Sequence, residues 1–227
     1  MNISNNDIYL RNKEAQVEYI IRKPKIETFN PPVLYLLHGL GSNEQDLFSF
    51  AEHLPANFLV ISVRAPYTIG LDSYSWYHVD FTSGDPIINR KEADKSRNML
   101  IQFIALMQQE YQFDPNQVFL CGFSQGAIMS YSIGLTRPDL IKGIALMSGR
   151  LPDETKSFVA TDEKLKNLAV FISHGIDDAV LPIQYAREGL EYLQTRNIKP
   201  TYKEYPAGHT INKEMLTDLV DWLNKIV

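Results

Sequence analysis

The sequence has little cysteine, no long apolar run and no excess of positive charge. A single cysteine, Cys121, in 227 residues excludes an internal disulfide and a cysteine-rich zinc or iron–sulfur site, and it favours a reducing compartment. A net charge of −5 provides no basic field that would attract nucleic acid or anionic lipid. No apolar run approaches the roughly 20 residues of a membrane helix, and the N-terminus lacks the basic start and apolar stretch of a signal peptide. We therefore expect a cytoplasmic protein that binds no nucleic acid and is not integral to a membrane.

The chain also lacks internal repeats, low-complexity tracts and Gly/Ser linkers, which favours one domain over residues 1–227. Short apolar runs alternate with helical patterns along its length. The expected strands are 17–21, 33–37, 58–62, 118–121, 144–147, 168–173 and 201–205, and the expected helices are 44–53, 89–111, 125–135, 183–196 and 212–227. This alternation predicts the α/β class, with a mostly parallel sheet covered by helices on both faces. A ligand site in such a sheet lies at the carboxyl ends of the strands.

Residues 122–126, Gly-Phe-Ser-Gln-Gly, match the pattern G-x-S-x-G. The motif lies between an apolar run that ends at Cys121 and a helix expected from Gln125, and this context places a serine on a sharp, exposed turn. Glycine on both sides allows the turn, because a side chain there would clash with the neighbouring strand or helix. The motif therefore predicts Ser124 as a nucleophile, although a tight turn without chemistry would show the same pattern.

A serine hydroxyl needs a nearby base to attack at neutral pH, and histidine is the usual base. Among the five histidines, His38 and His174 each follow an expected strand and precede glycine, which favours a role in a turn. His53 lies in a helical pattern typical of the surface, and His78 lies in an aromatic loop where its role stays open. His209 follows the last expected strand and precedes the last helix, at the edge of the sheet where a ligand site belongs. We predict His209 as the base.

Asp177 and Asp178 follow the expected strand that ends near Ser173. Their side chains diverge, so only one of them can orient the imidazole of His209, and the spacing alone does not choose between them. One of the pair would also suit the cap of the following helix. With either residue the order along the chain is Ser, Asp, His, which is the order found in α/β-hydrolases.

Two backbone N–H donors are needed to stabilise the oxyanion that forms when an acyl carbonyl is attacked. The amide of Gln125, directly after the predicted nucleophile, is one candidate. The loop 38–42 after the second expected strand should supply the other. Glycines on both sides of Leu40 let that backbone turn inward, so we predict the Leu40 amide as the second donor.

The segment 65–90 matches neither the strand nor the helix pattern and is rich in aromatic residues. Long unpatterned segments inside compact domains tend to be functional loops. This segment could form a wall for an apolar substrate, pack on the surface or provide a dimer contact. The sequence does not choose among these three roles. Several apolar residues flank the predicted catalytic positions and could line an acyl site, although core packing explains some of them equally well: Trp76, Phe123, Leu151, Val180 and Leu181.

Taken together, these motifs resemble the phospholipase/carboxylesterase family of small α/β-hydrolases, which includes acyl-protein thioesterases. The resemblance extends from about residue 32 to the C-terminus and rests on the segments 37–41, 75–77, 122–127, 148–152, 174–182 and 208–209. It implies an α/β-hydrolase fold and places the acid at the fifth position of the His-Gly-x-x-Asp segment, which selects Asp178. It also implies oxyanion donors at Leu40 and Gln125, and no metal or organic cofactor.

The resemblance further implies a serine carboxylesterase that cleaves small-molecule esters with an apolar acyl group through an acyl-enzyme. An acyl-thioesterase, a lysophospholipase or a lactone hydrolase could use the same triad, and a noncatalytic binding module on the same scaffold is the alternative outside enzymes. Ala179 stands where the family often has proline, and the segments 67–72 and 77–80 differ from its usual pattern. The resemblance therefore supports the reaction type better than the substrate.

Overall fold

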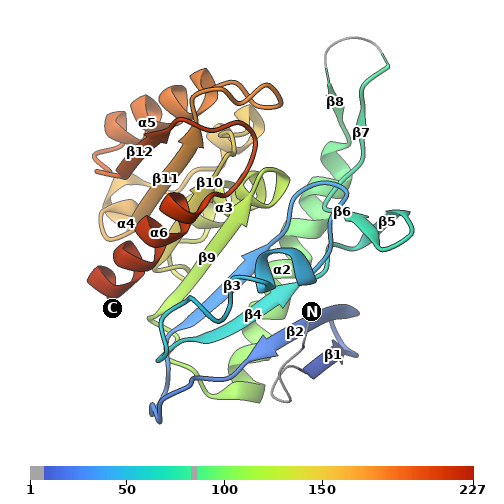
Figure 1. Cartoon of the computed structure of the whole chain (residues 1–227), viewed down its shortest axis with the longest axis vertical. Coiled ribbons are helices and arrows are strands. Elements are labelled where there is room, and N and C mark those ends of the chain that lie inside the picture. Colours follow the sequence, from blue (N-terminus) through green and yellow to red (C-terminus); the bar gives the residue numbers. More distant parts are fainter. Residues whose placement is uncertain (1–7, 83–85) are drawn as a thin grey trace.

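The computed structural model describes residues 8–82 and 86–227, and an eight-stranded sheet forms its centre (Figure 1). The strands of this sheet are β1 (Ile8–Asn12), β2 (Val17–Arg22), β3 (Val33–Leu37), β4 (Leu59–Val63), β9 (Val118–Phe123), β10 (Gly143–Met147), β11 (Ala169–Gly175) and β12 (Thr201–Tyr205). Their order in the sheet is β1-β2-β4-β3-β9-β10-β11-β12. Each strand predicted from the sequence is present within two residues of its expected ends, whereas β1 was not predicted.

The strands from β4 to β12 in this order run parallel, and only the β1–β2 and β2–β4 pairs are antiparallel. Strand β3 lies between β4 and β9, with Val33 opposite both Leu59 and Val118. Because parallel strands all end at the same edge, the loops that follow β3, β9, β10, β11 and β12 meet there. The predicted mostly parallel sheet is therefore confirmed, and the topology brings segments far apart in the sequence to one edge.

The main helices are α2 (Arg90–Tyr111), α3 (Gln125–Thr136), α5 (Gln184–Thr195) and α6 (Lys213–Ile226), with shorter turns at α1 (Gln45–Phe48), η1 (Asp153–Ser157) and α4 (Asp162–Leu165). The helix predicted over 44–53 is wrong in length, because α1 ends at Phe48. Beyond it the chain continues in tight turns whose amides bond three residues back, as in Phe50 to Leu47, and these turns bury the same apolar residues. Within the described residues, no helix has both the length and the apolar character needed to cross a membrane.

The sheet separates two apolar layers, which explains its continuous apolar strands. On β3, the side chains of Val33, Tyr35 and Leu37 pack with α2, α3 and α5 on one face. Leu34 and Leu36 point to the other face, where α1 and α6 contribute Leu47 and Trp222. Both faces of the central strands are therefore buried, as predicted for helices on both sides of a sheet.

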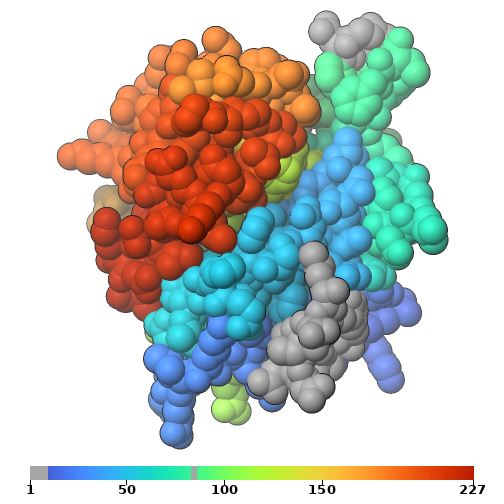
Figure 2. All heavy atoms as spheres, viewed as in Figure 1, coloured from blue at the N-terminus to red at the C-terminus, as the bar shows by residue number. Residues whose placement is uncertain are grey.

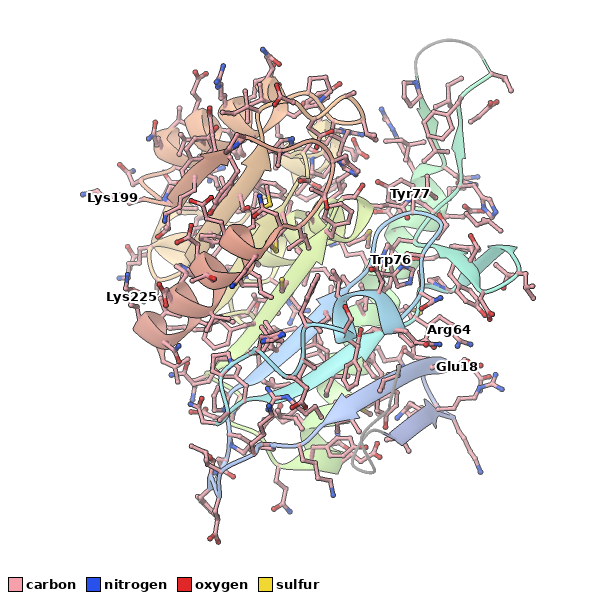
Figure 3. All side chains as sticks on the ribbon, viewed as in Figure 1. Glu18, Arg64, Trp76, Tyr77, Lys199 and Lys225 are labelled. Atoms are coloured by element: carbon pink, nitrogen blue, oxygen red, sulfur yellow. The ribbon has the colours of Figure 1, made fainter. Side chains whose placement is uncertain are left out.

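Arg64 ties the start of α1 to the sheet. Its guanidinium lies 2.5 and 2.6 Å from the two carboxylate oxygens of Glu44 and also contacts Glu18 (Figure 3). Glu44 is only 1% exposed, and its carbonyl accepts a hydrogen bond from the Ser62 hydroxyl. The hydrogen bond with Glu44 raises the pKa of Arg64 above its usual range. Because these bonds fix Glu44, they restrain one end of the loop that begins after β3.

The aromatic segment 65–90 contains two small antiparallel hairpins that were not predicted, formed by β5 (Tyr67–Gly70) with β6 (Ser73–Ser75) and by β7 (Val79–Asp80) with β8 (Ile87–Ile88). The second hairpin projects from the body of the molecule as an arm (Figure 2). Trp76 and Tyr77, between the hairpins, are buried, whereas Leu71 is 96% exposed. The segment thus combines core packing with an exposed apolar surface.

Helix α3 begins in direct contact with the end of β3, and Gly126 makes this contact possible. A Cβ atom at Gly126 would lie 1.9 Å from the carbonyl oxygen of Leu37 and 2.7 Å from that of His38. Such distances are far below van der Waals contact, so any side chain at this position must push α3 away from the sheet.

We predict that Gly126→Ala destabilises the protein by several kcal/mol, because backbone atoms cannot move aside cheaply. Urea unfolding should show a strongly lowered midpoint, or the variant should fail to fold. Gly70→Ala is the matched control, since a Cβ there meets only the Ser73 side chain at 3.4 Å. Equal stability of the two variants would contradict this account.

Candidate active site

Ser124 lies on the sharp turn between β9 and α3. Its backbone has φ +53° and ψ −117°, a left-handed conformation that is costly for a residue with a side chain. A Cβ at Gly122 would lie 2.2 Å from the carbonyl oxygen of Gly126, so the flanking glycines allow the turn to close. The amide of Ser124 donates to Met147 of β10 at 2.9 Å. The hydroxyl group is thereby held half-exposed at the carboxyl edge of the sheet.

The structure brings Ser124, His209 and Asp178 together. The Nε2 atom of His209 lies 2.9 Å from Oγ of Ser124, and its Nδ1 atom lies 2.7 Å from Oδ2 of Asp178. With the proton on Nδ1, the imidazole donates to the carboxylate and accepts from the hydroxyl. The ring of Phe123 packs on the imidazole with 4.8 Å between centroids. The three polar groups therefore form one continuous hydrogen-bonded chain.

Of the two adjacent aspartates, Asp178 contacts His209. Its side chain is 0% exposed, and its Oδ1 atom accepts from the amides of Val180 and Leu181 at 2.9 and 2.8 Å. Asp177 is exposed and contributes its amide to the carbonyl of Ala207 at 3.0 Å. The carboxylate of Asp178 thus has hydrogen-bond donors on both oxygens, which compensates for its burial.

His174 also faces Asp178, a contact that the sequence analysis missed by assigning this residue only to a turn. Its Nε2 atom lies 2.6 Å from the carbonyl oxygen of Leu181 and 3.4 Å from Oδ2 of Asp178. Burial lowers the pKa of His174, and the Leu181 carbonyl and the Asp178 carboxylate act in the opposite direction. A neutral imidazole with its proton on Nε2 fits these contacts. In the sequence, the signal that could have indicated this contact is the His-Gly pair 174–175, which lies shortly before Asp177 and Asp178.

The remaining histidines lie away from the Ser124 hydroxyl. His38 is buried, with Nδ1 2.8 Å from the carbonyl of Gly39 and Nε2 accepting from the Ala65 amide at 3.0 Å. Burial lowers the pKa of His38, and it fixes a turn as the sequence indicated. His53 is exposed, as expected, but outside a regular α-helix. His78 pairs with Glu92 at 2.8 Å.

One predicted oxyanion donor, Gln125, directly follows Ser124, and Gly39, the neighbour of the other donor Leu40, approaches Ser124. Gln125 is the first residue of α3, where amides point at the serine and favour negative charge. Gly39 approaches so closely that a Cβ there would lie 3.4 Å from Cβ of Ser124. In the part of the chain that the structure describes, neither the amide of Leu40 nor that of Gln125 donates to another protein group. The amides of Leu40 and Gln125 therefore stay the predicted oxyanion donors.

The residues predicted to line an acyl site are not equally accessible. Val180 is 64% exposed, and Phe123 and Leu181 are half-buried. Leu151 is only 9% exposed. Trp76 is 0% exposed, so the expectation that it contacts substrate does not fit its position; its indole N–H instead donates to the carbonyl of His38 at 2.8 Å. The other residues stay predicted substrate contacts.

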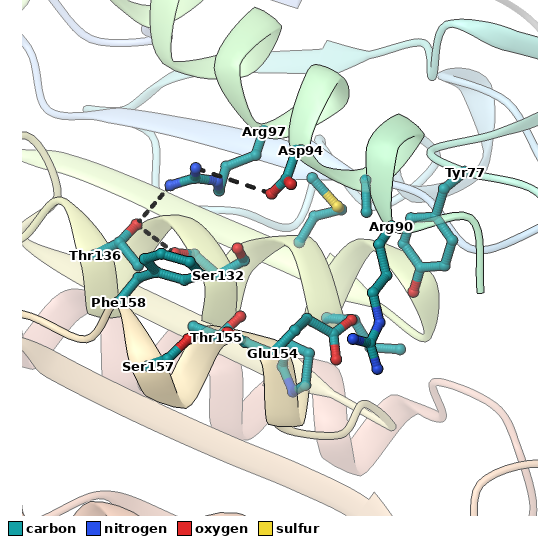
Figure 4. A pocket seen from close by; sticks show the side chains of 14 residues that line it. Tyr77, Arg90, Asp94, Arg97, Ser132, Thr136, Glu154, Thr155, Ser157 and Phe158 are labelled. Carbon is teal, nitrogen blue, oxygen red and sulfur yellow. Dashed lines mark hydrogen bonds and ion pairs between the residues drawn. The ribbon is translucent and has the colours of Figure 1, made fainter. Parts of the chain in front are cut away.

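Two surface cavities lie away from the triad. One of about 340 Å³ lies between α2, α3 and η1, and its lining includes Arg90, Arg97 and Phe158 (Figure 4). The other, of about 480 Å³, lies between the N-terminal part of α6 and Phe50. Neither is lined by Ser124, Asp178 or His209.

A family model described as phospholipase/carboxylesterase matches residues 21–227. The chain belongs to this family. The family membership confirms the predicted resemblance and, with the similar structures, the α/β-hydrolase fold and the class of serine hydrolases.

Similar proteins include carboxylesterase SOBER1 of Arabidopsis thaliana, 29% identical over 83% of this chain and 88% of its own length. Acyl-protein thioesterase 1 of Kluyveromyces lactis is 27% identical over 85% and 91%. A "probable inactive carboxylesterase" of Oryza sativa subsp. japonica is 26% identical over 84% and 83%. Among solved structures, the Bacillus cereus carboxylesterase superposes with a TM-score of 0.81, at 25% identity over 94% and 96% of the two chains.

The buried neutral histidines should make stability depend on pH. Unfolded histidine has a pKa of about 6.5, and burial lowers the pKa of His38 and His174 in the folded state. The unfolded chain therefore binds more protons as the pH falls below about 6.5, and the contribution of these groups to stability is lost in that direction.

We predict a lower urea midpoint at pH 5.5 than at pH 7.5, with at most about 1.4 kcal/mol lost per histidine. His174→Asn should reduce the difference between the two pH values, because one of the groups is removed. His53→Asn, on the surface, is the control and should leave that difference as in the wild type. A midpoint that does not change with pH would contradict the burial of neutral imidazoles.

Proposed function

We propose that the protein is a serine carboxylesterase that hydrolyses carboxylic esters through a Ser124–His209–Asp178 triad in a single α/β-hydrolase domain. The observation that carries the proposal is the continuous hydrogen-bonded chain from Oγ of Ser124 through the imidazole of His209 to the buried carboxylate of Asp178. Family membership supports the class of reaction. A cytoplasmic location and a homodimer stay predictions.

In the acylation step, Nε2 of His209 removes the hydroxyl proton of Ser124 while Oγ attacks the acyl carbonyl carbon. Asp178 holds the Nδ1–H tautomer and stabilises the imidazolium that forms. The developing oxyanion is bound by the amides of Leu40 and Gln125. His209 then gives its proton to the leaving alcohol, and the C–O bond to that alcohol breaks, which leaves an ester of Ser124.

In the deacylation step, His209 takes a proton from water, whose oxygen attacks the acyl carbon of the same ester. The second oxyanion is bound by the same amides. Collapse returns the proton from His209 to Ser124 and releases the carboxylic acid. No metal or organic cofactor is required for either step, because the imidazole moves each proton and the amides hold the charge.

We propose an apolar acyl group as the part of the substrate nearest the site, with Phe123, Leu151, Val180 and Leu181 as contacts. The exposure of Val180 and the half-burial of Leu181 support this, since both follow the acid that bonds to His209. The similarity to an acyl-protein thioesterase favours thioesters as the second candidate substrates. Lysophospholipids and lactones would use the same steps.

Ser124→Ala should lower the turnover of p-nitrophenyl butyrate by at least about 10⁴-fold, because no other group can form the acyl-enzyme. The midpoint of unfolding should not fall, since the change removes only a hydroxyl. A fluorophosphonate probe should label the wild type at Ser124 and leave the variant unlabelled. Ser49→Ala, an exposed serine, is the control and should keep full activity. Turnover retained in Ser124→Ala, or an unlabelled wild type as in a noncatalytic binding module, would reject the proposal.

A series of p-nitrophenyl esters from acetyl to decanoyl tests the acyl site. We expect kcat/KM to rise from acetyl towards longer chains, because each buried CH₂ contributes about 0.8 kcal/mol. Val180→Ser should flatten the series, whereas Ile69→Ser, an exposed apolar residue on the β5–β6 hairpin, should not. Thioesters of the same acyl groups measure the preference for sulfur. A steep preference for acetyl would rule out the apolar acyl contact.

A further inference from the structure

The segment Ser73–Tyr77 lies against the loop that carries Leu40. The amide of Gly41 donates to the carbonyl of Tyr74, and the amide of Tyr74 donates to that of Ser42, both at 2.9 Å. The hydroxyl of Ser73 donates to the carbonyl of Gly41 at 2.9 Å. These bonds join β6 and its flanking residues to the loop 38–42. The glycines of this loop would otherwise leave it mobile.

Trp76 fastens the same loop at its other end. The indole N–H donates to the carbonyl oxygen of His38 at 2.8 Å, and the indole ring lies beside the imidazole of His38 with 5.5 Å between centroids. The carbonyl of Trp76 accepts a hydrogen bond from the hydroxyl of Ser96 on α2. Trp76 is therefore fixed by a helix of the core and in turn fixes the residue two positions before Leu40.

The side chain of Gln125 binds the segment from the other direction. Its Oε1 atom accepts from the amide of Trp76 at 2.8 Å and from the hydroxyl of Ser75 at 3.2 Å, and its Nε2 atom donates to the carbonyl of Tyr77 at 2.9 Å. The side chain is buried. Gln125 thus supplies a predicted oxyanion donor through its backbone amide, and its side chain makes several hydrogen bonds to the segment Ser73–Tyr77.

We propose that Ser73–Tyr77 is a brace that sets the spacing between the amides of Leu40 and Gln125, with Trp76 and the Gln125 side chain as its positioning residues. The proposal rests on the proposed esterase function. The two donors lie on separate segments, the loop after β3 and the start of α3, and the indole of Trp76 and the amide side chain of Gln125 connect both of them to Ser73–Tyr77. Oxyanion stabilisation depends on donors that are already in place, at 2.7–3.1 Å in general, before charge develops. Loosening the brace should therefore raise the free-energy barrier of the chemical step without weakening substrate binding.

The test compares Trp76→Phe with Trp222→Phe. Phenylalanine keeps an aromatic ring at 76 but cannot donate to the His38 carbonyl. Trp222 is the other tryptophan of the chain, buried on the opposite face of the sheet, and its replacement has a comparable packing cost. Active sites are first counted by titration with a fluorophosphonate, and kcat is expressed per titrated site, so that partial misfolding does not enter the comparison.

We expect Trp76→Phe to lower kcat per site by about 10- to 100-fold, which is no more than the fall in kcat on losing a whole oxyanion donor. KM should stay within about twofold of the wild-type value. Trp222→Phe should keep kcat within about twofold. A trifluoromethyl ketone, whose adduct with serine carries an oxyanion, should bind Trp76→Phe more weakly by the same factor as kcat/KM falls. In the double variant Trp76→Phe/Gln125→Met, the loss should be smaller than the product of the single losses, because both changes release the same segment.

An unchanged kcat per site in Trp76→Phe, or a raised KM with normal kcat, would overturn the proposal, since the second result indicates substrate contact. Full additivity in the double variant would also overturn it. If wild-type protein neither hydrolyses esters nor is labelled at Ser124, the esterase function itself has failed. The two failures are therefore distinguishable.

Discussion

The turn at Ser124 is the constraint on which the rest of the site depends. A left-handed backbone at a residue with a side chain is unfavourable, and it persists because its surroundings leave no alternative. The amide of Ser124 bonds to β10, Gly122 and Gly126 close against each other, and α3 abuts the end of β3 at Gly126. The strain is thus held by the central sheet. The turn holds the Ser124 hydroxyl away from its own backbone and directs the first amides of α3 toward it.

The Asp178 carboxylate and the Gln125 side chain are held by several hydrogen bonds each, which makes the site rigid. The Asp178 carboxylate receives hydrogen bonds from two amides and from His209, and His174 lies beside it. The side chain of Gln125 makes three hydrogen bonds to the segment 75–77. Unpaired polar groups in such a place would cost more than they contribute. The reacting groups can therefore keep their geometry while charge moves among them.

Local patterns predicted most of the sheet and the long helices, because apolar runs and 3.6-residue periodicity reflect burial directly. Helix 44–53 was predicted too long, since turns that bond three residues back bury Leu47, Ala51 and Leu54 equally well. The hairpins in 65–90 were missed because two- to four-residue strands carry too little alternation to detect. Trp76 was interpreted as a substrate contact from its neighbourhood in the sequence, whereas its burial follows from packing against elements far along the chain.

From the sequence alone, the alternation of strands and helices, the glycine-flanked serine and the order of serine, acid and histidine were evident. These depend on local backbone demands and on the spacing of apolar residues, which a sequence carries directly. The resemblance to the family had already selected Asp178 over Asp177. Tertiary structure decided that His174 lies beside Asp178, and that Trp76 and Gln125 hold the loop after β3 and the start of α3 to one segment. Those choices depend on side-chain directions and hydrogen bonds between residues up to 50 positions apart, and only the folded sheet brings such groups within bonding distance.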